Sequence, residues 1–270
     1  MCGFAGFVDF RNRQQLPQYW EYLSQMGQEL SLRSPDGEQR VNFSHLWLVY
    51  RRLSIIDVAG GVQPIANEDE TLFVVVNGEI YNHIELRSHL REKHHFRTNS
   101  DAEIILHLYE ELGPKALNYL NGMFAIALWD KQRQQLFLAR DRLGIKPLYY
   151  TLVDSQLIFG STLASLLVHP KTPWYPQFED LYNFRATTSY VAGVYRLAGG
   201  HYFLFDAETK TVTPQCYWNL ADYLFTEPVK DSRTAKDYVQ EYRDLFVDSV
   251  SKSGFISTSF IATQKKLCLS

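Results

Sequence analysis

Residues 1–10 are Met-Cys-Gly-Phe-Ala-Gly-Phe-Val-Asp-Phe, and this stretch decides how the rest of the sequence is interpreted. Its apolar residues are nearly continuous, which predicts a mostly buried strand from residue 3 to residue 10. No basic segment precedes the apolar run, and Arg11 and Arg13 follow it, which is the reverse of a secretory signal peptide. We therefore expect residue 2 to stay in the mature protein, at the head of a core strand.

Cys2 is the first candidate for chemistry. Removal of Met1 would leave it as the N-terminal residue, with a thiol and a free α-amine on one carbon. An α-amine titrates near ~7.7–8.0 and a thiol near ~8.5, so the amine can accept the thiol proton at neutral pH, directly or through water. The alternative is an inert cysteine beside the start codon, and other residues must decide between the two.

The composition describes an ordinary globular chain. Its 270 residues are 46% hydrophobic and 21% charged, with a net charge of -3 and no long single-sign block, so nothing favours a nucleic-acid partner. No apolar run approaches the roughly 20 residues that span a bilayer. Cys2, Cys216 and Cys268 are far apart and odd in number, which favours free thiols over a disulfide framework. We expect a cytoplasmic protein that acts on a small molecule.

The hydrophobic pattern predicts both helices and strands, and so a layered α+β domain. Strands are expected at residues 45–50, 71–76, 123–129, 135–139, 148–152, 156–159, 201–205 and 212–218. Helices are expected from Pro17 to Leu30, at residues 81–92, 100–112, 163–168 and 234–250. Ser100 and Glu103 have the spacing of a capping box for the third of these helices. The consecutive hairpins between Met123 and Gly160 indicate an antiparallel β region.

Residues 77–82, Asn-Gly-Glu-Ile-Tyr-Asn, follow the strand that is expected to end at Val76. Backbone N–H groups are free where a strand ends. The Asn77 amide and the Gly78 N–H could therefore donate to an oxyanion, and glycine would let a substrate approach the backbone closely. A plain Asn-Gly turn is the commoner meaning of this dipeptide, but it does not account for residues 79–82.

Two further segments carry charges suited to a free amino acid. They are residues 51–57, Arg-Arg-Leu-Ser-Ile-Ile-Asp, and residues 99–103, Asn-Ser-Asp-Ala-Glu. An arginine can hold a carboxylate through two parallel hydrogen bonds, and an aspartate can hold an ammonium group. Taken singly, a solvated arginine at a strand end and an acid in the first turn of a helix explain them equally well.

Six blocks in one order resemble the glutaminase domain of asparagine synthetase, a class II glutamine amidotransferase. The blocks are residues 2–6, 33–37, 52–57, 77–82, 100–101 and 140–150, and the likeness covers roughly residues 2–220. This resemblance implies the N-terminal nucleophile hydrolase fold, a four-layer αββα sandwich of two antiparallel sheets between helices, with Cys2 opening a central strand.

The resemblance also implies roles for the matching residues. Cys2 would be the nucleophile, Asn77 and Gly78 would form the oxyanion hole, and three residues would surround the α-carboxylate and α-amine of L-glutamine. These three are Arg52, Glu79 and Asp101. Hydrolysis would need no metal or cofactor, whereas ATP and magnesium are implied only for a synthetase domain. The block at residues 140–150 receives a structural role and no catalytic one.

One position departs from the family pattern. Residues 33–36 are Arg-Ser-Pro-Asp, whereas Arg-Gly-Pro-Asp is usual, so Ser34 replaces the glycine. If that glycine adopts a positive φ, the serine would strain the loop and reduce activity.

The resemblance also divides the chain. Residues 2–220 are expected to form the glutaminase domain, residues 221–252 resemble the opening helix of a synthetase domain, and residues 253–270 are unassigned. No Ser-Gly-Gly-x-Asp-Ser loop for ATP is present in the sequence. We therefore expect a truncated synthetase that cannot make asparagine alone, which leaves a separate synthetase subunit as a candidate partner. The oligomeric state is open.

Two alternatives remain at this point. A glutaminase of a phosphoribosyl or sugar-phosphate amidotransferase would differ at residues 52–57 and 77–82. A non-catalytic, degenerate binding module is favoured by Ser34 and by the unassigned tail, but it is opposed by the intact candidate site. The eight histidines, including His94 and His95, form no recognisable ligand pattern and are predicted to be surface residues without a metal.

Overall fold

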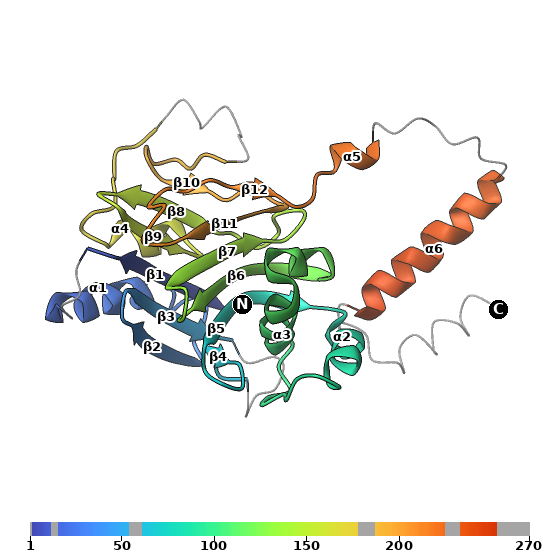
Figure 1. Cartoon of the computed structure of the whole chain (residues 1–270). Coiled ribbons are helices and arrows are strands. Elements are labelled where there is room, and N and C mark those ends of the chain that lie inside the picture. Colours follow the sequence, from blue (N-terminus) through green and yellow to red (C-terminus); the bar gives the residue numbers. More distant parts are fainter. Residues whose placement is uncertain (1, 12–15, 54–60, 178–186, 225–232, 253–270) are drawn as a thin grey trace. The chain divides into compact units, whose positions relative to one another are not determined.

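A computed structural model describes residues 2–11, 16–53, 61–177, 187–224 and 233–252 (Figure 1). The block at residues 54–57 therefore lies outside the described residues. The chain divides into two compact units, Met1–Asn219 and Leu220–Ser270. All strands among the described residues belong to the first unit.

The first unit contains two antiparallel sheets of six strands each (Figure 1). The order in the first sheet is β10 (Tyr195–Arg196), β8 (Tyr149–Val153), β9 (Gln156–Gly160), β1 (Gly3–Asp9), β3 (Leu46–Arg52) and β2 (Gly37–Phe43). The order in the second is β12 (Gln215–Cys216), β11 (His201–Phe205), β7 (Gln135–Arg140), β6 (Gly122–Asp130), β5 (Leu72–Ile80) and β4 (Ile65–Ala66).

Helices of the first unit cover its sheets, and the second unit contains helices only among the described residues. The first unit contains α1 (Pro17–Gln28), α2 (His83–Leu90), α3 (Glu103–Leu112), the 3-10 helix η1 (Gly113–Asn118) and α4 (Leu163–Leu167). The second unit contains α5 (Ala221–Leu224) and α6 (Ala235–Lys252).

Three hydrophobic clusters fill the spaces between the layers. The central cluster lies between the sheets and includes Phe4 and Tyr50 from the first sheet and Trp129 from the second. Another cluster joins the outer face of the second sheet to α3, and the third joins the outer face of the first sheet to α1 and α4. The order helix, sheet, sheet, helix confirms the predicted αββα sandwich (Figure 1).

Strand β1 lies between β9 and β3, and all seven of its residues are buried. Successive side chains of a strand point to opposite faces. Phe4 and Val8 therefore pack in the central cluster, while Ala5 and Phe7 contact the cluster beneath α1. Burial on both faces explains the nearly continuous apolar run that predicted this strand.

Some strands were missed or too long in the prediction. Strand β2 is half-exposed and mostly polar, and β4 and β10 have two residues each, so none of them shows an apolar alternation. Within residues 212–218 only Gln215 and Cys216 pair, with β11.

The predicted capping box is wrong. Helix α3 begins at Glu103 after Ala102, and the Glu103 carboxylate accepts hydrogen bonds from the N–H groups of Arg97 (2.6 Å) and Thr98 (2.8 Å). Ser100 Oγ instead accepts from the Ala102 N–H at 3.3 Å. The loop before α3 folds back over the helix start, so Glu103 finds donors further back along the chain than residue 100.

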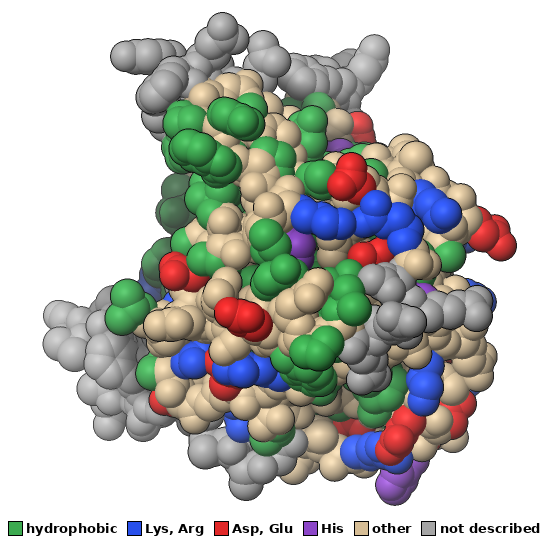
Figure 2. Space-filling view, turned by 90° about the vertical axis from the view of Figure 1, so that its left-hand side faces the viewer, with side chains coloured by type: hydrophobic (Ala, Val, Ile, Leu, Met, Phe, Trp, Pro, Cys, Tyr) green, Lys and Arg blue, Asp and Glu red, His purple; other side chains and the backbone are tan. Residues whose placement is uncertain are grey.

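On the face drawn in Figure 2, basic and acidic side chains of the described residues are interspersed with hydrophobic ones. Several large aromatic side chains of the first unit are at least 46% exposed, namely Tyr119, Trp174, Tyr175, Tyr190 and Tyr195. In the second unit, α6 exposes the four residues of its predicted apolar face, Tyr238, Tyr242, Leu245 and Phe246. None of the described helices combines the length and the apolar character that crossing a bilayer requires.

The prediction that the histidines are surface residues is wrong for two of them. His107 is fully buried and His169 is 1% exposed. The His169 ring packs against Phe7 and Tyr22, with ring centroids 4.9 and 5.2 Å apart. These aromatic neighbours come from β1 and α1, which is why local sequence did not reveal the burial.

We predict that His169 makes the fold acid-sensitive. Burial, helped by the charge of Lys171 and opposed by Asp9, lowers the pKa of His169 from 6.5 to about 4. Between these values the unfolded chain binds a proton that the native state does not, so stability is lost as pH falls from about 6.5 to 4. The loss from this group is at most about 3 kcal/mol.

The variant His169→Asn should lose stability at pH 7.5 but show a shallower decline between pH 6.5 and 4.5. The asparagine oxygen can still accept from the Lys171 N–H, as Nδ1 does at 3.3 Å, but it does not titrate. Urea denaturation of the full chain at several pH values measures both slopes. Parallel slopes for the two proteins would contradict the assignment.

Candidate functional site

Cys2 lies directly before β1 and is half-buried. Its Sγ is 3.4 Å from both the N–H and the carbonyl oxygen of Leu53. Gly3 pairs with Arg51 in β3, so the end of β3 runs beside residue 2. The Leu53 N–H donates to the sulfur, and a donor at this position stabilises a thiolate.

Tyr50 of β3 forms the buried side of the thiol site, and sequence reasoning missed it. Burial raises the pKa of Tyr50 far above its ordinary value, and interaction with the Cys2 thiol adds to this effect. The phenol therefore stays protonated and can serve as a hydrogen-bond donor. Arg52 and Asp101 also act electrostatically on Tyr50, so both of these predicted site residues lie near it.

Two side chains from different parts of the chain hold the backbone of Cys2. Arg33 Nε donates to the Cys2 carbonyl oxygen at 3.1 Å. Asn77 is fully buried, and its amide satisfies both neighbours when its NH2 donates to the same oxygen at 2.6 Å and its oxygen accepts from Arg33 at 3.1 Å. One amide N–H of Asn77 is thus engaged with Cys2, and the NH2 group has a second.

The expected end of a strand at Val76 is wrong, because β5 continues to Ile80 and pairs Gly78 with Phe124 of β6. The Gly78 N–H nevertheless faces away from β6. Val76 N–H donates to Gln63 Oε1 (2.6 Å) and Ile80 N–H to Asp101 Oδ2 (2.7 Å), both outside the β5–β6 pair. N–H directions alternate along a strand, so Gly78, two residues from each, points to the same edge.

Glu79 and Asp101 form an acidic pair. Asp101 is buried, and burial raises its pKa although the Ile80 N–H opposes this change. Burial also raises the pKa of Glu79, the charge of Asp101 adds to it, and Lys146 opposes it. Both carboxylates would gain from a further positive charge, so the pair suits an ammonium group.

Lys146 lies near the predicted site residues, although residues 140–150 were assigned only a structural role. Its side chain is nearly buried. Burial and the charge of Arg33 lower the pKa of Lys146, while Glu79, Asp141 and Cys2 raise it. The sequence signal that could have indicated this burial is a lysine between apolar residues, Ile145 and Pro147, in a charge-rich segment.

The rest of this segment is structural, as expected. Arg140 donates to the carbonyl oxygens of Lys146 and Leu197 at 2.6 Å each. Asp141 accepts from the N–H groups of Phe124 and Ile145.

Arg52 ends β3 and is half-buried. With Tyr50 and Val62 it lines a cavity of about 350 Å³, whose other lining residues are at positions 36–39. The other five predicted site residues are not among those that line it. The structure nevertheless brings all six predicted residues into one region of the first unit, around Cys2 and Tyr50.

The expected strain at Ser34 is not found. Ser34 is fully buried and does not adopt a positive φ, and its N–H donates to the Leu30 carbonyl at 3.0 Å. The backbone after α1 continues a helical turn at this point, which serine tolerates.

A cysteine at the head of a central strand in an αββα sandwich is the arrangement of the N-terminal nucleophile hydrolase fold. A solved structure with this architecture, glutamine phosphoribosylpyrophosphate amidotransferase from B. subtilis, is similar with a TM-score of 0.59. It is 15% identical and covers 80% of this chain and 49% of that one, so it supports the fold alone.

Residues 1–218 match the family model of the glutamine amidotransferase domain, and the chain belongs to this family. It is 39% identical over 263 residues to asparagine synthetase [glutamine-hydrolyzing] 2 of Bacillus subtilis (strain 168). The alignment covers 93% of this chain and 35% of that protein. Asparagine synthetase [glutamine-hydrolyzing] 3 of the same organism is 34% identical, over 93% of this chain and 41% of its own length.

A fungal relative is also similar. Amidase chyE of Penicillium rubens is 32% identical over 93% of this chain and 38% of its own length. The chain thus spans roughly a third to two fifths of these curated relatives. The family expected from the six sequence blocks is confirmed: this is a glutamine amidotransferase domain related to glutamine-hydrolysing asparagine synthetases.

Gly78 offers a test of the geometry around the site. A Cβ at Gly78 would lie 2.0 Å from the Met123 carbonyl oxygen, whereas one at Gly37 of β2 would meet nothing within 4 Å. Gly78→Ala should therefore lower the free energy of unfolding by about 1–3 kcal/mol through overpacking. The matched control Gly37→Ala should leave it within about 0.5 kcal/mol. Urea denaturation measures both, and equal effects would refute this packing of β5 on β6.

Proposed function

We propose that this chain hydrolyses L-glutamine to glutamate and ammonia with Cys2 as an N-terminal nucleophile, after removal of Met1. The observation that carries the proposal is that backbone and amide donors from two strands, β3 and β5, lie around Cys2. Leu53 follows β3, and Asn77 and Gly78 lie on β5. A nucleophile beside preorganised N–H donors is the arrangement that acyl transfer requires.

The first half of the reaction forms a thioester. The α-amine of Cys2 takes the thiol proton, and the thiolate attacks the side-chain amide carbon of glutamine. The resulting oxyanion accepts hydrogen bonds from the Gly78 N–H and the free Asn77 amide N–H. The ammonium group of Cys2 then returns its proton to the leaving nitrogen, the C–N bond breaks, and ammonia departs.

The second half releases glutamate. Water attacks the γ-glutamyl thioester while the α-amine accepts a water proton, and the same two donors hold the second oxyanion. The C–S bond breaks and the proton returns to the thiolate, which regenerates Cys2. The proposed hydrolysis needs no metal and no cofactor.

Recognition of glutamine is assigned to the charged residues around the thiol. Arg52, which lines the 350 Å³ cavity, would hold the α-carboxylate, and Glu79 with Asp101 would hold the α-ammonium group. The raised pKa values of both acids support this role, because a bound ammonium group would offset the cost of burying two carboxylates side by side.

The fate of the ammonia is proposed from the relatives. Two of them are named asparagine synthetases (glutamine-hydrolysing), and the alignment with the first continues past residue 218. We propose that the ammonia is used to make asparagine from aspartate, in a synthetase domain or a separate synthetase subunit that would require ATP and magnesium.

Cys2→Ala should abolish ammonia release from glutamine, and Asn77→Ala should lower kcat on the order of 10²–10³. The control is Cys216→Ala, which removes an exposed thiol and should leave activity unchanged. A coupled glutamate assay measures all three, with circular dichroism to verify folding. Wild-type activity in Cys2→Ala would rule out the proposed nucleophile.

Asp101→Asn should raise KM for glutamine by about 10-fold to 100-fold, since one charged hydrogen bond contributes about 1.5–3 kcal/mol. The asparagine oxygen can still accept from the Ile80 N–H, so the fold should persist. Arg52→Ala should have an effect of similar size.

A substrate that lacks the α-amine, 4-carbamoylbutanoate, separates the two roles. The wild-type protein and Asp101→Asn should use it equally well, whereas Arg52→Ala should still be impaired. If Asp101→Asn were as damaging with this substrate as with glutamine, Asp101 would not be the ammonium partner.

A further inference from the structure

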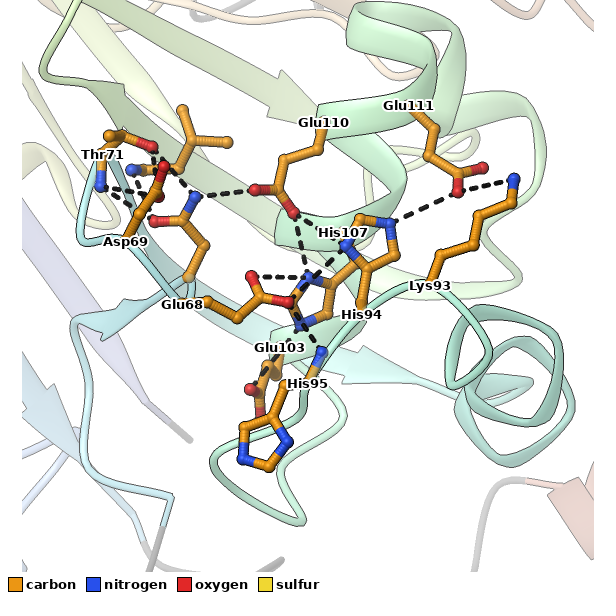
Figure 3. Close-up of polar contacts among 12 residues, drawn as sticks. Glu68, Asp69, Thr71, Lys93, His94, His95, Glu103, His107, Glu110 and Glu111 are labelled. Atoms are coloured by element: carbon orange, nitrogen blue, oxygen red, sulfur yellow. Dashed lines mark hydrogen bonds and ion pairs between the residues drawn. The ribbon is translucent and has the colours of Figure 1, made fainter.

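Two histidines and two glutamates converge outside the Cys2 site. Glu68 follows β4, His94 follows α2, and His107 and Glu110 lie on α3 (Figure 3). One ligating atom from each lies within 4.8 Å of the others. His107 Nδ1 and His94 Nδ1 are 3.0 and 3.4 Å from Glu110 Oε2. Both Nδ1 atoms are 3.7 Å from a Glu68 oxygen.

We propose that these four side chains bind one zinc ion. Tetrahedral zinc has ligands at about 2.0–2.2 Å, which places them roughly 3.3–3.5 Å from one another. Most separations seen here require shifts of only a few tenths of an ångström. Two carboxylates and two neutral imidazoles also balance the charge of a divalent cation. Four protein ligands close the coordination sphere, so the site belongs to the structural class.

The Nε2 atoms of both imidazoles, which point away from the shared centre, also lie beside carboxylates. His94 Nε2 is 3.3 Å from Glu111 Oε1, and His107 Nε2 is 3.7 Å from Glu103 Oε1 (Figure 3). A histidine bound to a metal through one nitrogen commonly presents its other N–H to a carboxylate, which fixes the ring and its tautomer. Both rings therefore present Nδ1 toward the shared centre.

The two carboxylate ligands are oriented as well. Asn67 Nδ2 donates to Glu110 Oε1 at 2.7 Å and leaves Oε2 for the centre. The His95 backbone N–H donates to Glu68 Oε1, also at 2.7 Å, and so fixes that carboxylate. All four proposed ligands thus have an outer partner, and such partners strengthen metal binding.

A proton is the competing occupant of this cluster. Burial alone would lower the pKa of His107, but the nearby carboxylates of Glu103, Glu110 and Glu68 raise it to about 9. A protonated His107 among carboxylates would hold the same side chains together without zinc. The experiment therefore has to distinguish uptake of the metal from simple ion pairing.

An ion bound by these four side chains would join three consecutive segments of the chain. It would tie the β4–β5 turn and the segment after α2 to α3. Asp101 lies two residues before the start of α3, so a metal on this helix would also steady that residue.

The test measures zinc binding to the metal-stripped full chain by calorimetry, with the stoichiometry from elemental analysis. We expect one zinc per chain, and a Kd weakened at least about 100-fold in His94→Gln and in Glu110→Gln. His95→Gln is the matched control, because it is the same substitution at the neighbouring position. His95 is exposed and its ring points away from the cluster (Figure 3). Its Kd should be unchanged. Zinc should also raise the Tm by several degrees in the wild-type chain and not in His94→Gln.

Three results would overturn the proposal. The first is no zinc uptake by the folded, metal-stripped chain, which would leave a network held by protons. The second is equal affinity in His94→Gln and the wild-type chain. The third is zinc lost from Cys2→Ala but retained by His94→Gln, which would place the metal at the thiol. Circular dichroism of each variant confirms that it is folded, and Glu110, an exposed residue, can change without opening the core.

Discussion

The position of residue 2 depends on one hydrogen-bonded clamp. The Cys2 carbonyl oxygen accepts from Arg33 and, in the orientation that satisfies both neighbours, from Asn77. Asn77 comes from the second sheet, whereas β1 belongs to the first, so the clamp joins the two sheets at the site. Because all of these groups are buried or half-buried, losing one partner would leave an unsatisfied polar group. The thiol is thereby held at a fixed distance from the donors of β3 and β5.

The local sequence predicted what local physics controls. The central strand, the amphipathic helices and the hairpins from Met123 to Gly160 show their apolar patterns directly, and the six family blocks indicated the candidate site. Tertiary partners decided the rest. The Gly78 N–H points away from β6 because N–H directions alternate along a strand. Glu103 accepts hydrogen bonds from the preceding loop because the chain folds back over α3. Ser34 lies in a helical turn rather than a strained loop.

The missed residues share a physical cause. Tyr50 and Lys146 are distant in sequence, and each acquires its role only when β1, β3 and the 140–150 segment meet around Cys2. The histidines gave no pattern because the ligands of the proposed zinc site come from three segments, of which only α3 contributes two. Helix α3 thus links that site with Asp101. A zinc ion that stabilises α3 would therefore also stabilise the position of Asp101 in the proposed ammonium pocket.

The proposed chemistry requires Cys2 to react as the N-terminal residue. Intact-mass spectrometry of the purified chain, before and after exposure to an electrophilic glutamine analogue, tests it most directly. We expect a mass lacking Met1 and a single adduct that peptide mapping places on Cys2, with none in Cys2→Ala. A fully reactive chain that retains Met1, or an adduct at another residue, would contradict it.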